Sequence, residues 1–351
     1  MNAQERFRKT LAFEQTDRPP LWLMRQAGRY LPEYQKIRKQ HDFWQVCHTP
    51  TLSTQVALEP LRAFQLDAAI VFSDILVIPQ ALGTEVLFNS TNQSAGPVMK
   101  RKLQTTKDLE QWDMAHALEK LMFVAQAVKD LKQNLNNQYG LVGFAGAPFT
   151  LFAYMAEGGS SDDFIYARKL LLSNPKLVHQ ALEQLATIIA ELLVLQIKEG
   201  VDVVQIFDTW GGLLSSEDYQ TFCVPAIQRI AKRVHQENGK ILLFVKAGHH
   251  LLPVLNQTHC DGFSLDWRTG FAEARQFLPH SILQGNIDPL LLFGSQEQIK
   301  NKLDLLFKEI EQLHSGKGII LNLGHGIMPE TPVHNVEFLC RYVHQFRFHQ
   351  S

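Results

Sequence analysis

Short apolar runs recur along this 351-residue chain, each followed by small, polar, glycine or proline residues. Runs of this length that are rich in β-branched and aromatic residues are typical of buried strands. Eight of them occur, at residues 21–24, 68–72, 141–144, 201–207, 241–245, 262–265, 282–283 and 319–323. The pattern therefore predicts eight strands that are apolar on both faces.

Helical patterns lie between most of these runs. The clearest covers residues 175–199, where Asn174 is a candidate N-cap, Pro175 suits the first turn and apolar residues repeat every three or four positions. Two more helices are predicted, for residues 215–238 and from residue 331 onwards.

Strands that alternate with helices predict a parallel sheet covered by helices, and eight repeats is the number that closes a barrel. We therefore predict an α/β protein with a single (β/α)8 TIM barrel spanning residues 1–351, of which 1–18 form an amino-terminal arm. A doubly wound sheet is less favoured, because the glycine spacing in residues 143–149 does not fit a phosphate-binding turn. The long connections 75–139 and 145–202 are expected to build loops over the carboxyl-terminal face.

Composition favours an ordinary globular protein. Apolar residues make up 45% and charged residues 20%, and 34 Lys plus Arg against 35 Asp plus Glu leave a net charge of −1. This balance gives no general attraction to nucleic acid or to an anionic membrane. Recognition of an anion must therefore be local.

No targeting or membrane segment is expected. The amino terminus lacks an apolar targeting region, and Glu191 and Gln196 interrupt the richest apolar helix. The four cysteines show no C-x-x-C spacing, which fits reduced, structural thiols in a cytoplasmic protein: Cys47, Cys223, Cys260 and Cys340.

The carboxyl ends of barrel strands carry the chemistry of such folds. Polar residues follow nearly every predicted strand: Arg25 and Arg29, Asp74, Asp208 with Thr209, Lys246, Asp266, Asn286 with Asp288, and His325.

Arg25 and Arg29 flank Gly28 directly after the first run. A guanidinium is a rigid fork of donors that matches a carboxylate, so the pair is suited to gripping separate carboxylates of one ligand. An internal salt bridge, for instance to Glu33, explains the same spacing equally well.

Asp74 and His325 are the other candidates with specific features. Asp74 follows an apolar run and needs donors if buried, although capping the next helix is an equal alternative. His325 stands between two glycines, which leaves its ring open toward the barrel mouth. A purely structural histidine is the commoner case.

Two other chemistries are weaker alternatives. Lys246 at a strand end is a candidate Schiff-base lysine, but nothing nearby marks a desolvated amine. The group His249, His250, His259 and Cys260 contains metal-ligand types without a zinc-site spacing, so no metal site is predicted.

Five segments, in order along nearly the whole chain, carry a resemblance: RPPLWLMRQAGRYLPEY, FSDIL, GFAGAPFTLFAYMAEGG, QIFDTWGG and LNLGHGIMPETP. Together they closely resemble the uroporphyrinogen decarboxylase family, enzymes of porphyrin and heme biosynthesis. The resemblance implies a cytoplasmic, homodimeric carboxy-lyase. It would convert the four acetates of uroporphyrinogen III to the methyls of coproporphyrinogen III without metal or organic cofactor. It implies a small-molecule substrate and no nucleic-acid or membrane partner.

The resemblance also implies site residues. Catalysis would fall to Asp74 and Arg25, and the substrate would be bound by Arg25, Gln26, Ala27, Gly28, Arg29, Asp74, Tyr154, Thr209 and His325. Many relatives have Ser at position 209, where this chain keeps a hydroxyl. The segment FVKAGHH follows the family only loosely, so the resemblance assigns nothing to Lys246, His249 or His250.

The substrate's chemistry fits these residues. It carries eight carboxylates on its rim and four pyrrole N–H groups at its centre, so arginines suit the rim and an acceptor such as Asp74 suits the centre. The proton donor stays open between Arg25, His325 and water. Two rival functions are a zinc-dependent corrinoid methyltransferase and a tetrapyrrole carrier without turnover.

Overall fold

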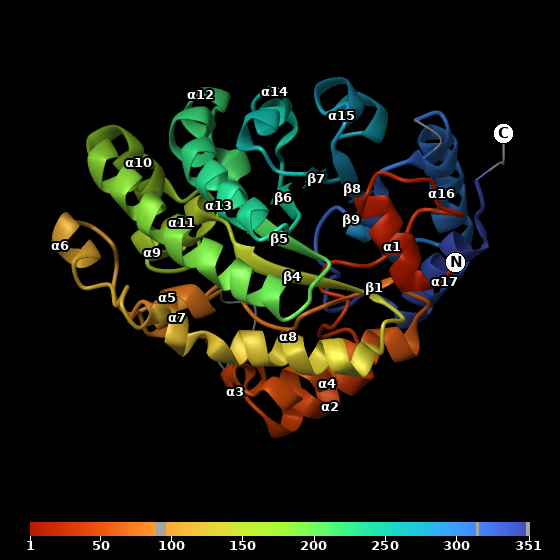
Figure 1. The fold of residues 1–351 in the computed structure, drawn as a ribbon, viewed down its shortest axis with the longest axis horizontal. Coiled ribbons are helices and arrows are strands. Elements are labelled where there is room, and N and C mark those ends of the chain that lie inside the picture. The colour runs from red at the N-terminus through yellow and green to blue at the C-terminus, as the bar shows by residue number, and fades with distance from the viewer. Residues whose placement is uncertain (89–95, 314–315, 349–351) are drawn as a thin grey trace.

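The computed structural model describes residues 1–88, 96–313 and 316–348. Seven parallel strands form one curled sheet in the order β1-β4-β5-β6-β7-β8-β9, with helices around it (Figure 1). The strands are β1 (Ala68–Ile70), β4 (Gly140–Gly146), β5 (Val203–Asp208), β6 (Ile241–Val245), β7 (Gly262–Ser264), β8 (Ile282–Ile287) and β9 (Ile319–Leu323). The predicted α/β class with a parallel sheet is confirmed, and seven of the eight predicted strands pair in it.

The eighth predicted strand, residues 21–24, is wrong as a regular strand. It forms a single parallel bridge, between Leu21 and Leu321 of β9. The Leu321 N–H donates to the Pro20 carbonyl at 2.9 Å, and the Asp67 N–H, at the other edge of the sheet, donates to the Leu21 carbonyl at 2.7 Å. Both edges of the sheet are thus hydrogen-bonded to this segment. The Trp22 N–H donates to the Leu321 carbonyl at 3.3 Å, whereas the other N–H groups of the segment use side-chain acceptors, as Met24 does with Asn322 Oδ1 at 2.7 Å.

The outer helices follow the predicted patterns with one exception. In α11 (Pro175–Lys198), the Asn174 side chain accepts from the Leu177 N–H at 3.3 Å, which confirms the predicted cap. The predicted helix 215–238 is instead divided into α12 (Ser216–Asp218), the π-helical η2 (Tyr219–Cys223) and α13 (Val224–Gln236). Pro225 explains the break, because it lacks the N–H that a continuous α-helix would use.

The remaining elements fill the connections. They are α1 (Ala3–Leu11), α2 (Pro32–Gln40), α3 (Phe43–His48), α4 (Pro50–Ala63), α5 (Val77–Ala81), β2 (Val86–Leu87), β3 (Val98–Met99), α6 (Thr106–Leu109), α7 (Ala117–Lys120), α8 (Met122–Leu135), α9 (Pro148–Glu157), α10 (Ile165–Ser173), η1 (Gly211–Leu213), η3 (His249–Leu251), α14 (Leu252–Leu255), η4 (Asn256–Thr258), α15 (Phe271–Phe277), η5 (Pro289–Phe293), α16 (Gln296–Glu311) and α17 (Val333–Gln345). The predicted loop 75–139 contains residues 89–95, which lie outside the described residues.

The inside of the sheet is packed, not hollow. Apolar side chains from α1, the 21–24 segment and the strands form one cluster, which includes Phe7, Trp22, Val142 and Phe244. A polar hub lies among them, where Gln284 Nε2 donates to Gln205 Oε1 and Ser264 Oγ, and Trp22 Nε1–H donates to Gln284 Oε1, each at 2.9 Å. The hub links β5, β7 and β8 to the 21–24 segment. These hydrogen bonds between side chains of different strands favour one strand register, although the buried Gln205 Nε2 has no hydrogen-bond partner among the described residues.

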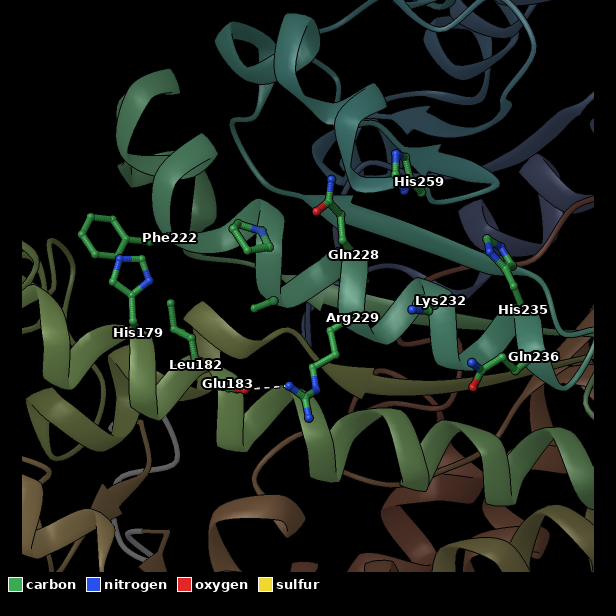
Figure 2. Close-up of a pocket in the computed structure, with 12 residues that line it drawn as sticks. His179, Leu182, Glu183, Phe222, Gln228, Arg229, Lys232, His235, Gln236 and His259 are labelled. Atoms are coloured by element: carbon green, nitrogen blue, oxygen red, sulfur yellow. Dashed lines mark hydrogen bonds and ion pairs between the residues drawn. The ribbon is translucent and has the colours of Figure 1, made fainter.

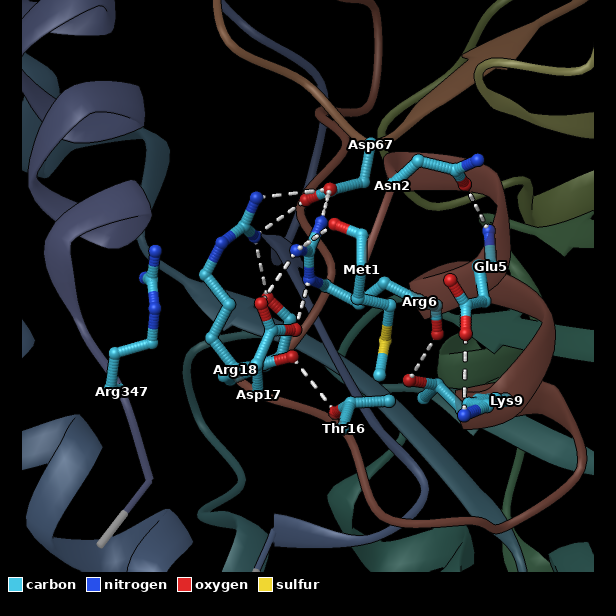
Figure 3. Close-up of polar contacts among 12 residues, drawn as sticks. Met1, Asn2, Glu5, Arg6, Lys9, Thr16, Asp17, Arg18, Asp67 and Arg347 are labelled. Atoms are coloured by element: carbon cyan, nitrogen blue, oxygen red, sulfur yellow. Dashed lines mark hydrogen bonds and ion pairs between the residues drawn. The ribbon is translucent and has the colours of Figure 1, made fainter.

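A buried ionic cluster ties the amino terminus to the start of β1 (Figure 3). Asp67 receives 2.6 Å hydrogen bonds from both Arg6 and Arg18, and the Leu21 N–H donates to it at 2.8 Å. Arg6 also pairs with Asp17 at 2.6 Å. This cluster joins α1, the 21–24 segment and β1 at the end of the sheet opposite the strand carboxyl ends.

Helix α11 alone, among the described helices, is long and apolar enough to span a membrane by length and composition. Its apolar window is 67% buried, and the helix packs against α13, α9 and β4. This is the environment of a core helix. All four cysteines are buried free thiols, as predicted.

Candidate active site

The loop after the 21–24 segment is held by Gln26. Its buried side chain accepts from the Leu23 N–H at 3.1 Å and donates to the Ala68 carbonyl of β1 at 3.2 Å. Arg25 has a left-handed backbone, with φ 61°, which is uncommon for a residue with a side chain. Such backbone conformations persist where the surrounding structure holds them, often at functional sites. The backbone of Gln26 is also used inside the protein, because its N–H donates to the Leu23 carbonyl at 2.8 Å and its carbonyl accepts from the Tyr30 OH at 2.7 Å. Gln26 therefore positions this loop.

Two glycines make room around Arg25. A Cβ atom at Gly28 would lie 2.9 Å from the Arg25 carbonyl, and one at Gly326 would lie 2.3 Å from Arg25 Cδ. The Ile327 N–H also donates to the Met24 carbonyl at 2.9 Å. The exposed Arg25 side chain therefore runs across the loop that follows β9, beside His325.

Asp74 lies in the turn after β1 and is half-buried. The Leu76 N–H donates to its Oδ1 at 2.8 Å, so it does shape the turn before α5. Burial raises the pKa of the Asp74 carboxyl, while the Leu76 N–H and the charge of Arg25 oppose that rise. Asp74 thus combines a local hydrogen bond with the charge of Arg25, which follows the 21–24 segment beside β1.

Tyr154 of α9 belongs to the same neighbourhood. Burial is the main cause that raises the pKa of Tyr154; the charge of Asp74 adds to the rise and that of Arg25 opposes it. Its ring packs edge-on to Phe164, with centroids 5.4 Å apart, and to Trp210 at 6.1 Å. The structure therefore brings together Arg25, Asp74 and Tyr154.

His325 is half-buried after β9, with its ring centroid 6.1 Å from that of Phe244. Burial and the positive charges of Arg25, Lys246 and Arg268 lower the pKa of His325 to about 3. The imidazole is therefore neutral near pH 7. A neutral His325 suits hydrogen bonding to a ligand better than donation of an imidazolium proton.

Thr209 follows β5 and is half-buried, and its neighbour Asp208 anchors this strand end. Thr150 Oγ donates to Asp208 Oδ1 at 2.7 Å and Tyr219 OH donates to Oδ2 at 3.0 Å. The Trp210 N–H donates to Thr150 Oγ at 3.1 Å. Burial raises the pKa of Asp208 to about 6, against the effect of these donors.

Replacing Tyr219 with Phe should destabilise the protein by about 1–3 kcal/mol, because a buried carboxylate loses a donor. The folded-state pKa of Asp208 lies above its ordinary value of 3.8, so stability from this group is lost as pH rises from about 4 through about 6. At pH 8 the carboxylate is ionised and depends more on the hydroxyl donor. The Phe variant should therefore lose more stability at pH 8 than at pH 5 in urea unfolding. Equal losses at both pH values would show that the hydroxyl does not serve the ionised carboxylate.

Arg29 is exposed, four residues after Arg25. Burial raises the pKa of Tyr34, and the charge of Arg29 opposes that rise. The Tyr34 ring lies 5.8 Å from that of Phe72, two residues before Asp74. Ala27 and Gly28 are half-buried between the two arginines. Arg29 thus stands on the β1 side of the mouth.

Other strand-end polar residues have structural partners. Asp266 accepts from the Ala247 N–H at 2.6 Å, Asn286 Nδ2 donates to the Thr269 carbonyl at 2.7 Å, and Asp288 accepts from the Leu290 N–H at 2.9 Å. Trp210 and Arg268, which also lie after strand ends, were not among the site residues predicted from the sequence. Trp210 stood inside a quoted motif, QIFDTWGG, but Arg268 had no sequence signal beyond following the seventh run.

The weaker metal hypothesis finds no cluster to support it. Within residues 1–88, 96–313 and 316–348, no three His, Cys, Asp or Glu side chains converge as metal ligands would. His249 pairs with Glu273 at 3.4 Å, and His250 Nε2 lies 2.8 Å from the Leu214 carbonyl.

A separate surface groove lies between α11 and α13, away from the strand ends (Figure 2). Arg229 and Glu183 bridge it with a 2.7 Å ion pair, and Lys232 also lines it. None of the predicted site residues lines this groove.

Comparisons with known proteins show the family of this chain. The sequence profile of the family described as Uroporphyrinogen decarboxylase (URO-D) matches residues 2–346. A protein named uroporphyrinogen decarboxylase from Tolumonas auensis is 39% identical over 99% of this chain and 98% of its own. The protein of that name from Coxiella burnetii is 40% identical over 97% of this chain and 95% of its own.

A solved methyltransferase from Methanosarcina mazei has a similar structure, with a TM-score of 0.80 over 98% of this chain and 99% of that one. The two share 20% sequence identity, so this likeness concerns the fold alone, and it accords with a TIM-like architecture. The profile match and the full-length relatives decide the family. This chain belongs to the uroporphyrinogen decarboxylase family.

Proposed function

We propose that this protein is a carboxy-lyase that removes CO2 from the four acetate side chains of uroporphyrinogen III to give coproporphyrinogen III. The observation that carries the proposal is that Arg25 and Asp74 follow two segments hydrogen-bonded side by side, where Gln26 Nε2 donates to the Ala68 carbonyl of β1 at 3.2 Å. The charge of Arg25 acts on the Asp74 carboxyl from there. The two groups match a ligand with carboxylates at its rim and N–H donors at its centre.

Asp74 is the central acceptor in this proposal. An ionised carboxylate offers about four lone-pair positions, and four pyrrole N–H groups need acceptors. The Leu76 N–H already uses one position at 2.8 Å and fixes the orientation of the carboxyl group. About three positions would remain for the ligand, so Asp74 would accept directly from about three of the pyrrole N–H groups.

The chemical step needs a negative charge at this place. A proton adds to the pyrrole carbon next to the acetate, and the C–CO2 bond then breaks, its electron pair neutralising the cationic ring. The exocyclic carbon takes up a proton to become a methyl, and the ring carbon returns the first proton, so each CO2 released consumes one proton. The ring is cationic before the bond breaks, and a fixed carboxylate beneath it is worth on the order of 3–4 kcal/mol.

Arg25 binds the departing acetate and relays a proton from water in our proposal. A guanidinium with a pKa above 12 is itself a poor acid near neutrality, and His325 is neutral there. His325, Tyr154 and Thr209 would line the pocket. Arg29 would bind a second carboxylate. Gln26 would hold the substrate-binding loop in place, and Ala27 and Gly28 would contribute backbone groups.

Replacing Arg25 with Lys should lower kcat/KM by about 10- to 100-fold, the range for losing one hydrogen bond to a charged group. Lysine keeps the positive charge but loses the planar fork that holds a carboxylate with two hydrogen bonds. Steady-state kinetics with uroporphyrinogen measures the effect. Normal turnover by the Lys variant would mean that two-pronged binding is not what this position supplies.

The function itself is tested by anaerobic incubation with enzymatically generated uroporphyrinogen, followed by chromatography of the oxidised products. We expect coproporphyrin together with hepta-, hexa- and pentacarboxylate intermediates. Recovery of only the octacarboxylate from folded protein would refute the proposal.

We further propose that the chain closes as one (β/α)8 catalytic domain, with the two long connections over the mouth. The contact between β3 and Gly159 supports this, because it joins those connections.

We also propose a cytoplasmic homodimer that needs no metal or organic cofactor. Exposed apolar side chains after β8 and β9, at Leu290, Phe293 and Met328, suit a subunit interface. A single species of 40.0 kDa in sedimentation equilibrium would contradict the dimer.

A further inference from the structure

Two cations at the strand ends have no part in the proposed chemistry. Lys246 follows β6 directly, and Arg268 lies in the loop after β7. In the strand order these positions are about halfway round from the segment that carries Arg25. They therefore belong to the other side of the strand-end face.

Buried Asp266 holds the two loops together. Its Oδ2 accepts from the Ala247 N–H at 2.6 Å and from Arg268 Nη1 at 2.8 Å, while its Oδ1 accepts from the Arg268 N–H at 2.9 Å. The guanidinium also lies 4.5 Å from the centre of the Trp267 ring. Arg268 is thus exposed but held in a fixed orientation, with donors left over.

Lys246 is the less engaged of the two. Its Nζ lies 5.5 Å from the centre of the Trp210 ring, beside the wall formed with Tyr154. None of the ion pairs in the described part of the chain includes Lys246. An ammonium group at the mouth without a carboxylate partner is suited to receive one from a ligand.

Close backbone contacts bring both cations to the pocket. A Cβ atom at Gly324 would lie 2.7 Å from the Trp267 nitrogen, so the loop carrying His325 packs against the loop carrying Arg268. A Cβ atom at Gly212 would lie 2.1 Å from the Lys246 carbonyl, so the turn after Thr209 packs against Lys246. The charges of both cations also help to keep His325 neutral.

We propose that Lys246 and Arg268 form a second carboxylate-binding edge, which holds propionate side chains of the bound tetrapyrrole. This inference rests on the proposed function. The acetates are lost one by one, whereas the propionates remain through all four steps. An edge that helps to bind every intermediate must therefore use the propionates, with Arg25 and Asp74 left to act on the reacting acetate.

The test compares Lys246→Gln and Arg268→Gln with wild type, using two ligands under anaerobic conditions. KM is measured with uroporphyrinogen, and Ki is measured with coproporphyrinogen, which has propionates but no acetates, as a competing product. Each variant should raise both constants by about 3- to 10-fold with little change in kcat, as for loss of a partly exposed charge pair. Lys232→Gln, in the groove of Figure 2, removes the same charge far from the mouth and should change neither constant.

Arg268→Lys keeps a positive charge beside Asp266, so it tests the same position if the Gln variant does not fold. Unchanged KM and Ki in Lys246→Gln, with an active wild type, would overturn this inference and leave the proposed function standing. A rise in KM without a rise in Ki would also overturn it, because the edge would then hold acetates. A wild type without decarboxylation would refute the proposed function, and this inference with it.

Discussion

Asp74→Asn is expected to lower kcat for uroporphyrinogen decarboxylation by about 100-fold or more, the typical loss when one preorganised electrostatic group is removed. The Asn side chain has nearly the same shape and can still accept from the Leu76 N–H. It cannot carry the negative charge that the cationic ring requires. Steady-state kinetics of the purified variant gives the result.

Stability of the same variant provides the control. Because burial raises the pKa of Asp74 in the folded state, the favourable contribution of this group is present at low pH and is lost as pH rises from about 3.8 through the folded-state pKa. A neutral Asn avoids that loss. At pH 7.5 the variant should therefore melt at or above the wild-type temperature. An inactive variant that melts well below wild type would make the kinetic result uninformative about charge, and Asp74→Glu would then be the variant to assay.

Asp67→Asn is expected to lower the free energy of unfolding by about 3–5 kcal/mol, the usual result of breaking a buried ion pair from one side. Arg18 and Asp67 each have side chains 1% exposed, and Arg6 is 6% exposed (Figure 3). Asn would leave the buried Arg18 guanidinium without its ion-pair partner and would leave Arg6 paired with Asp17 alone. Urea unfolding followed by circular dichroism measures the loss.

Asp17→Asn is the matched control for this cluster, because Asp17 also binds Arg6 but its side chain is 30% exposed. It should cost clearly less than Asp67→Asn. Similar small losses for both variants would mean that the cluster at the start of β1 does not stabilise the fold.

The apolar runs predicted the sheet well because strands buried on both faces are apolar at nearly every position. Residues 241–245 and 319–323 match β6 and β9 end to end. The 21–24 segment has the same apolar character but is not a regular strand. The Leu21 and Met24 N–H groups donate to the Asp67 and Asn322 side chains, which are distant in sequence, and the local pattern carries no sign of such partners.

The site was predictable to a different degree at each residue. Arg25, Asp74, Tyr154 and His325 stood in motifs, and in the structure the charge of Arg25 acts on each of the other three. Asp266 was visible as an ionisable strand end, but its role in holding Arg268 depends on contacts between loops. Sequence also gives no account of His325 remaining neutral, because that follows from burial and from three cations on three different loops.

The central claim, that an ionised Asp74 stabilises the cationic ring, is tested most directly by a single turnover with enzyme in excess over uroporphyrinogen. Formation of the heptacarboxylate isolates the first decarboxylation from product release. Wild type is predicted to convert the bound substrate at least about 100-fold faster than Asp74→Asn. An Asn variant that forms the heptacarboxylate at the wild-type rate would contradict the claim.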